Sequence, residues 1–122
     1  MATIVHFDVA CEDPERAKKF YAALFGFKYQ LVPEFQYNLI ETTDLDGKPG
    51  VRGGLGKRMD SSQRITNYFG VKSIDAAMKQ VTVLGGTVTS PKMPVPGMGY
   101  LANCVDTEGN VFGLWEENAG AK

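Results

Sequence analysis

The sequence has few of the residues from which metal centres and disulfide frameworks are built. Its 122 residues include one histidine, His6, and two cysteines, Cys11 and Cys104. The cysteines do not have the C-x-x-C spacing of redox and zinc motifs, so we expect two small buried thiols, although they could pair in an oxidising compartment. A set of two histidines and one carboxylate, which often holds iron, cannot be built from a single histidine.

The chain also lacks an excess of charge and a long apolar run. Its 13 basic and 14 acidic residues give a formal charge of −1 without a run of like charge, so nucleic acid is not an expected partner. The N-terminus lacks the basic and apolar regions of a signal peptide, and no segment approaches the roughly 18 apolar residues of a membrane span. We therefore expect a single cytoplasmic domain with no membrane partner.

The residues that are present predict one order of strands and helices, which occurs twice. Apolar alternation predicts a strand over residues 3–11, and a helix follows that begins near Asp13-Pro14 and ends at Gly26. Further strands are predicted at about 27–32, 36–42 and 51–57. The second half has a strand over 65–71, a helix capped by Ser73 and ended by Gly85-Gly86, and strands near 87–89, 99–105 and 111–116. The proline-rich segment before residue 99 is expected to be a loop, either a lid or a connection.

Sliding the chain along itself strengthens the evidence for a duplication. A shift of 60 residues aligns Val5 with Ile65, Val9 with Phe69, Cys11 with Val71, Ala17 with Ala77, Leu24 with Leu84 and Gly26 with Gly86. A shift of 59 aligns Gly54-Leu55 with Gly113-Leu114. We therefore predict an α+β fold of two βαβββ modules, at about 3–57 and 65–117, joined by a linker at about 58–64.

Blocks of residues along nearly the whole chain resemble the vicinal oxygen chelate superfamily, which contains glyoxalases, bleomycin resistance proteins and dioxygenases. The first half contributes His6-Phe7-Asp8, Asp13-Pro14-Glu15-Arg16-Ala17, Phe20-Tyr21 and Leu24-Phe25-Gly26-Phe27. The second half contributes Leu84-Gly85-Gly86, Pro96-Gly97-Met98-Gly99, Asp106-Thr107-Glu108-Gly109-Asn110 and Phe112-Gly113-Leu114-Trp115. The resemblance implies an open, barrel-like mixed sheet with helices outside and a cleft for a divalent metal or a small ligand.

The same resemblance implies one metal ligand on the first and on the last strand of each module. These positions fall on His6, Thr66, Gly54 and Gly113. Only His6 is a usual ligand, whereas catalytic transition-metal sites need about three protein donors. We therefore predict that the protein uses no metal and no other cofactor.

Strand parity predicts which residues face the cleft. His6 and Asp8 should share that face, with Phe7 and Val9 beneath the helix, and Thr66 and Tyr68 should do the same in the second module, with Phe69 and Val71 beneath its helix. The residues expected to bind a ligand are His6, Asp8, Asn38, Arg52, Thr66, Tyr68 and Trp115. Alternatives stay open, because Tyr68 and Trp115 could be core residues and His6 could be the remnant of an ancestral ligand position.

These observations favour a metal-independent small-molecule binding protein for an apolar or aromatic compound. A second hypothesis, which the resemblance supplies, is a lyase or isomerase related to lactoylglutathione lyase. Such an enzyme would use His6 and Asp8 as catalytic acid and base, or a metal site that the sequence does not reveal. A structural role with a vestigial cleft is a third. Exposed strand edges and apolar cleft walls also predict a homodimer.

Overall fold

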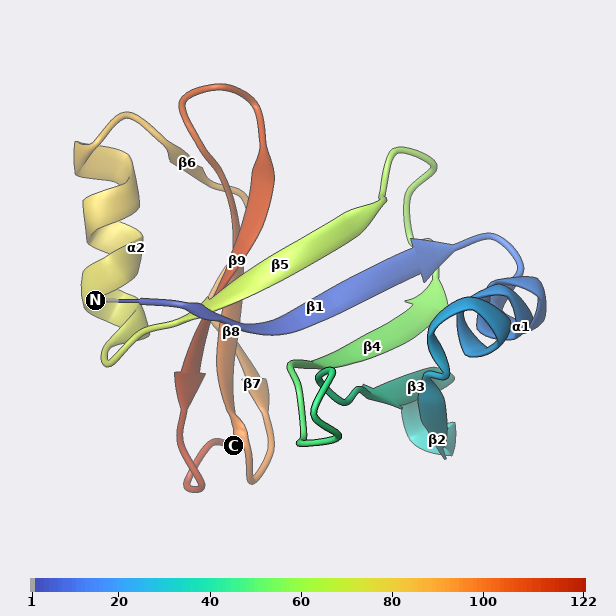
Figure 1. The fold of residues 1–122 in the computed structure, drawn as a ribbon. Helices are drawn as coiled ribbons and strands as arrows, with labels where there is room; N and C mark the ends of the chain where they lie inside the picture. The colour runs from blue at the N-terminus through green and yellow to red at the C-terminus, as the bar shows by residue number, and fades with distance from the viewer. Residues whose placement is uncertain (1) are drawn as a thin grey trace. The chain divides into compact units, whose positions relative to one another are not determined.

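The computed structural model describes residues 2–122, which form nine β-strands, two α-helices and one 3-10 helix (Figure 1). These residues divide into two compact units, one of residues 6–66 and one of residues 67–122 with the segment before His6. Each unit has one α-helix and a mixed sheet, so the predicted α+β fold class is confirmed. Neither α-helix of the described chain is long and apolar enough to cross a lipid bilayer.

The unit of residues 6–66 is a four-stranded sheet with one helix on one of its faces. In sheet order its strands are β2 (Lys28–Val32), β3 (Tyr37–Glu41), β4 (Arg52–Lys57) and β1 (Ile4–Cys11). β1 and β4 are parallel, and the other neighbours are antiparallel. The 3-10 helix (Pro33–Phe35) lies between β2 and β3.

Helix α1 (Pro14–Phe25) has the start and the end that its sequence predicts. The Asp13 side chain accepts a hydrogen bond from the Arg16 amide at 3.1 Å, and Gly26 ends the helix with a φ of 72°. A left-handed φ of this kind favours glycine, since a side chain there costs free energy. Ala17 and Tyr21 of the helix pack against a buried cluster of Val9, Ile40 and Leu55.

The unit of residues 67–122 has the corresponding arrangement. Its strands are, in order, β5 (Ile65–Gly70, from Asn67 on), β9 (Val111–Glu117), β8 (Gly99–Val105) and β6 (Thr87–Val88), and β7 (Met93–Val95) also pairs with β8. Helix α2 (Ile74–Val83) starts at Ser73, whose side chain accepts from the Ala76 amide, and Glu116 Oε1 accepts from the Ile74 amide at 3.0 Å. Ile74 is fully buried among residues of β8 and β9.

The repeat in the sequence is matched by the register of the paired strands. In the first unit Asp8 pairs with Gly54, Val9 with Leu55 and Ala10 with Gly56. The positions related by the two shifts pair in the same way in the second unit, namely Tyr68 with Gly113, Phe69 with Leu114 and Gly70 with Trp115. Both units therefore place equivalent residues beside one another on a parallel strand pair.

One segment differs from its predicted structure. The proline-rich segment contains strand β7, which forms a hairpin with β8 through a turn at Pro96-Gly97. Pro94 is tolerated in it because a proline at a sheet edge leaves no ladder hydrogen bond unmade.

Phe69 is the register partner of Leu114, which packs with Ile74 of helix α2, so Phe69 lies on the helix side of the sheet. It is half-buried and meets Phe112 edge-on, with ring centroids 6.3 Å apart.

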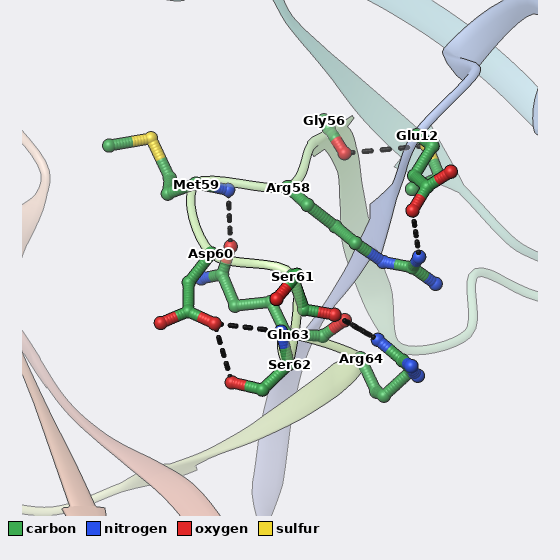
Figure 2. Close-up of polar contacts among 10 residues, drawn as sticks. Glu12, Gly56, Arg58, Met59, Asp60, Ser61, Ser62, Gln63 and Arg64 are labelled. Carbon is green, nitrogen blue, oxygen red and sulfur yellow. Dashed lines mark hydrogen bonds and ion pairs between the residues drawn. The ribbon is translucent and has the colours of Figure 1, made fainter.

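The segment predicted to be a linker is an ordered loop attached to the end of β1. The Arg58 amide donates to the Cys11 carbonyl at 2.9 Å, and the Ala10 amide donates to the Arg64 carbonyl at 3.1 Å. Within the loop, the Met59 amide donates to Gln63 Oε1 at 2.7 Å (Figure 2). Both ends of the loop are thus held by backbone hydrogen bonds.

Candidate functional site

Three polar side chains meet in the unit of residues 6–66, on the sheet face opposite helix α1. His6 Nε2 lies 2.8 Å from Asp8 Oδ1 and 3.0 Å from the Tyr37 hydroxyl. The Tyr37 hydroxyl donates a hydrogen bond to the same Asp8 oxygen. The side chains of His6 and Asp8 are 28% and 32% exposed, so the group is accessible to a small molecule without being fully solvated.

The group forms because strand alternation and a glycine bring these side chains together. His6 and Asp8 are two residues apart on β1 and therefore share a face, while Phe7 and Val9 pack on the helix side. Tyr37 lies on β3, and its ring crosses β4 above Gly54. A β-carbon built on Gly54 would overlap the Tyr37 hydroxyl, so any larger residue there would displace the phenol.

Tyr37 is the residue of this group that the sequence did not reveal. The prediction chose its neighbour Asn38, which is 5% exposed and pairs with the core residue Leu55, so the structure places Asn38 on the helix side. The assignment of Asn38 to the same face as His6 is therefore wrong. The available signal was the alternation of Gly54 and Gly56 on the neighbouring strand, which leaves room for a large side chain from β3.

Arg52, one of the residues expected to bind a ligand, lies on the strand next to this group. It is the partner of His6 in the parallel β1–β4 pair, and register partners on adjacent strands project to the same face. The Arg52 side chain is exposed. The Arg52 side chain therefore projects from the same sheet face as Asp8, His6 and Tyr37.

The remaining predicted ligand residues lie on β5 and β9. Tyr68 is 7% exposed, because its ring lies over Gly113, and its hydroxyl donates to Asn103 Oδ1 at 3.2 Å. Trp115 is half-buried and lies over Gly99. Thr66 is half-buried, two residues before Tyr68 on β5. The burial of Tyr68 favours the reading of this residue as a core side chain.

A divalent metal, which the resemblance implies, would need a set of suitable donor side chains. Among residues 2–122, no group of three or more histidine, cysteine, aspartate or glutamate side chains is placed to hold a metal ion. His6 and Asp8 are two donors, but the glycines at the last-strand positions are covered by the rings of Tyr37 and Tyr68. These residues do not fit a transition-metal site, which needs about three such donors.

The two thiols do not add a nucleophile to the site. Burial raises the pKa of the Cys11 thiol, whose Sγ donates to the Gly56 carbonyl at 3.3 Å, although the nearby Arg58 opposes this shift. Burial also raises the pKa of Cys104, which is fully buried. A thiol with a raised pKa is mostly protonated near neutral pH and is a poor nucleophile.

Comparison with known sequences places the chain among proteins of varied activity. A family model described as the Glyoxalase/Bleomycin resistance protein/Dioxygenase superfamily matches residues 3–114. The Mycobacterium tuberculosis protein named "Putative glyoxylase CFP32" is 27% identical over 121 residues, covering 91% of this chain. This chain spans only 44% of the length of that relative, so the activity of the whole relative is not assigned to this chain.

Solved structures show the same fold at low sequence identity. Streptomyces coelicolor methylmalonyl-CoA epimerase in complex with 2-nitronate-propionyl-CoA is 20% identical, with a TM-score of 0.66 and coverage of 95% of this chain and 97% of that chain. A glyoxalase/bleomycin resistance protein/dioxygenase superfamily member from Vibrio splendidus is 14% identical, with a TM-score of 0.67 and coverage of 96% and 100%. At these identities the likeness is one of fold.

Proposed function

Because the chain belongs to the Glyoxalase/Bleomycin resistance protein/Dioxygenase superfamily, we propose that it binds a small organic molecule without a metal ion, on the sheet face where His6, Asp8 and Tyr37 meet. The observation that supports this most is their mutual hydrogen bonding beside a glycine that a phenol covers. A few convergent polar groups are typical of sites that orient a small ligand.

The chemistry of the three side chains suits an oxygen-bearing ligand. A ligand hydroxyl can donate to the Tyr37 oxygen, whose own proton goes to Asp8, and a ligand carbonyl oxygen can accept from the Tyr37 hydroxyl or the His6 ring in place of Asp8. Asp8 keeps both groups in place, since it accepts from the phenol and lies against the imidazole. Binding of this kind needs no Lewis acid.

Two substitutions test the location of the site. Tyr37→Phe removes the hydroxyl that contacts Asp8 and His6, and it should weaken ligand binding by about tenfold or more. Tyr29→Phe is the matched control, because it removes a hydroxyl that donates to the Lys18 carbonyl beside helix α1. Native mass spectrometry and a ligand-shift screen would measure both. Equal binding by the two variants would contradict the proposed site.

The hydrogen bonds among His6, Asp8 and Tyr37 also support a second candidate function, acid–base catalysis. A phenol, a carboxylate and an imidazole in mutual contact can pass a proton to or from a bound substrate. Solved structures of similar fold include the Streptomyces coelicolor methylmalonyl-CoA epimerase, whose activity is a property of that protein. Deuterium exchange at a carbon next to a ligand carbonyl, lost in His6→Ala, would favour this candidate over simple binding.

A further inference from the structure

Arg52 occupies a specific position relative to the proposed site. It is the register partner of His6 across two parallel strands, which lie about 4.8 Å apart in a sheet. The next pair on the same face is Asp8 and Gly54, which lie two residues further along these strands, about 6.5 Å away. A ligand oxygen that reaches His6 and Tyr37 would therefore have its neighbouring atoms within reach of the long Arg52 side chain.

Arg52 differs from the other arginines in having no intramolecular partner among residues 2–122. Arg16 pairs with Asp13 at 3.9 Å and Arg58 pairs with Glu12 at 3.2 Å. Arg64 Nη1 donates to the carbonyls of Ser61 and Gln63, both at 2.8 Å (Figure 2). No ion pair or side-chain hydrogen bond of the described chain involves Arg52, so its donors are directed only to solvent or to a ligand.

Two acids of strands β1–β4 lie on this face of the sheet. Asp8 accepts from the Tyr37 hydroxyl and lies against His6. Glu41 is the cross-strand neighbour of Lys28 and lies one step beyond the Ile40–Gly53 pair, opposite Arg52. No ion pair among residues 2–122 joins Arg52 to either acid, so an incoming anion can supply its counter-ion.

A guanidinium binds a carboxylate more strongly than the corresponding neutral ester, because its two parallel N–H donors match the two charged carboxylate oxygens. Resting on the proposed function, we infer that the ligand is a small carboxylic acid with a hydroxyl or carbonyl oxygen beside the carboxylate. Arg52 binds the carboxylate, and His6 and Tyr37 contact the second oxygen. Arg52 is therefore the residue that makes the site prefer a negatively charged ligand over a neutral one.

The test uses matched pairs of probes with and without the charge. A panel of 2-hydroxy and 2-oxo acids, including lactate, pyruvate and phenyllactate, is titrated beside the corresponding methyl esters, and binding to the ¹⁵N-labelled protein is followed by NMR. The acids should bind about tenfold more tightly than their esters, and Arg52→Gln should remove this difference. Arg52→Lys should retain part of it, since it keeps the charge without the two-pronged geometry.

Lys57→Gln provides the control for a general loss of positive charge. Lys57 is an exposed residue of the same strand, but it pairs with Cys11 and therefore projects from the helix side of the sheet. This variant should keep the preference for acids. A loss of preference in both variants would show nonspecific attraction and would overturn the role of Arg52.

The remaining outcomes separate this inference from the proposed function. If esters bind as tightly as acids and Tyr37→Phe weakens both, the site is correct and the inference about charge is wrong. If neither acids nor esters perturb the resonances of His6 and Tyr37, the proposed site and the inference both fail. Arg52 is exposed, so Arg52→Gln should unfold at the same temperature as the natural protein, and a melt verifies that binding changes are not losses of fold.

Discussion

The contact between Tyr37 and Gly54 predicts that adding one methyl group, in Gly54→Ala, destabilises the protein. In Gly54→Ala the new β-carbon would overlap the Tyr37 hydroxyl and the ring atoms next to it. The neighbours of the ring belong to β-strands and cannot move easily, so the phenol itself must turn away. It would then lose its hydrogen bonds to Asp8 and His6.

The free energy of unfolding should fall by about 2 to 5 kcal/mol in Gly54→Ala. A hydrogen bond to a charged group contributes about 1.5 to 3 kcal/mol, and an overpacked site costs about 1 to 3 kcal/mol. Alanine recovers about 0.5 to 1 kcal/mol, because glycine loses more conformational freedom in a strand. Urea denaturation measures the net change.

Gly56→Ala is the matched control for this prediction. Gly56 lies two residues further on the same strand and face, and a β-carbon there would meet Tyr37 Cδ1 at 3.4 Å, an ordinary contact. It should change stability by less than about 1 kcal/mol. In a Tyr37→Ala background, Gly54→Ala should become neutral or slightly stabilising. Equal effects of the two glycine variants in the natural background would refute the packing of Tyr37 over Gly54.

Four further predictions concern the core, the metal and the assembly. Tyr68→Ala should cost about 3 to 5 kcal/mol on thermal or urea unfolding, since the buried ring would leave a cavity over Gly113, whereas Tyr68→Phe should cost about 1 kcal/mol. Val9→Ala should cost about 2 to 3 kcal/mol by the same measurement, because Val9 is 8% exposed within the first core cluster. Elemental analysis after dialysis against a weak chelator should find far less than one transition metal per chain, and a stoichiometric metal would contradict the metal-independent site. Light scattering should give a dimer mass at micromolar concentration, because Phe20, Leu24 and Phe25 of helix α1 are each more than half exposed, and a monomer mass would count against pairing.

The fold could be predicted because its signals are local and occur twice. The Asp13 cap, Pro14 and Gly26 define helix α1 within a few residues, and no knowledge of tertiary contacts is needed to read them. Strand β7 was missed because Pro94 is a strong argument against a strand in sequence alone. Only the pairing of β7 at the sheet edge removes that argument.

The site could be predicted in part, because alternation fixes the face of a strand once one of its residues is placed. On β1, the apolar Phe7 and Val9 identify the helix side, and His6 and Asp8 follow on the other. On β3 the neighbours Tyr37 and Asn38 could each be buried, and a shift of one residue moves every side chain to the opposite face. The error at Asn38 arose from this ambiguity, which only the pairing of Asn38 with Leu55 resolves.

The two units fill equivalent space in different ways, so residues 67–122 do not repeat the polar group of His6, Asp8 and Tyr37. Above Gly54 the phenol comes from β3, and Asp8 and His6 on β1 contact its hydroxyl. Above Gly113 the phenol is Tyr68 itself, the repeat counterpart of Asp8, and the counterpart of His6 is Thr66. At these two positions the second unit therefore has neither a carboxylate nor an imidazole, and the Tyr68 hydroxyl donates to the Asn103 amide oxygen. Ligand chemistry is accordingly expected to depend on the side chains of residues 6–66, while substitutions at Tyr68 act mainly on stability.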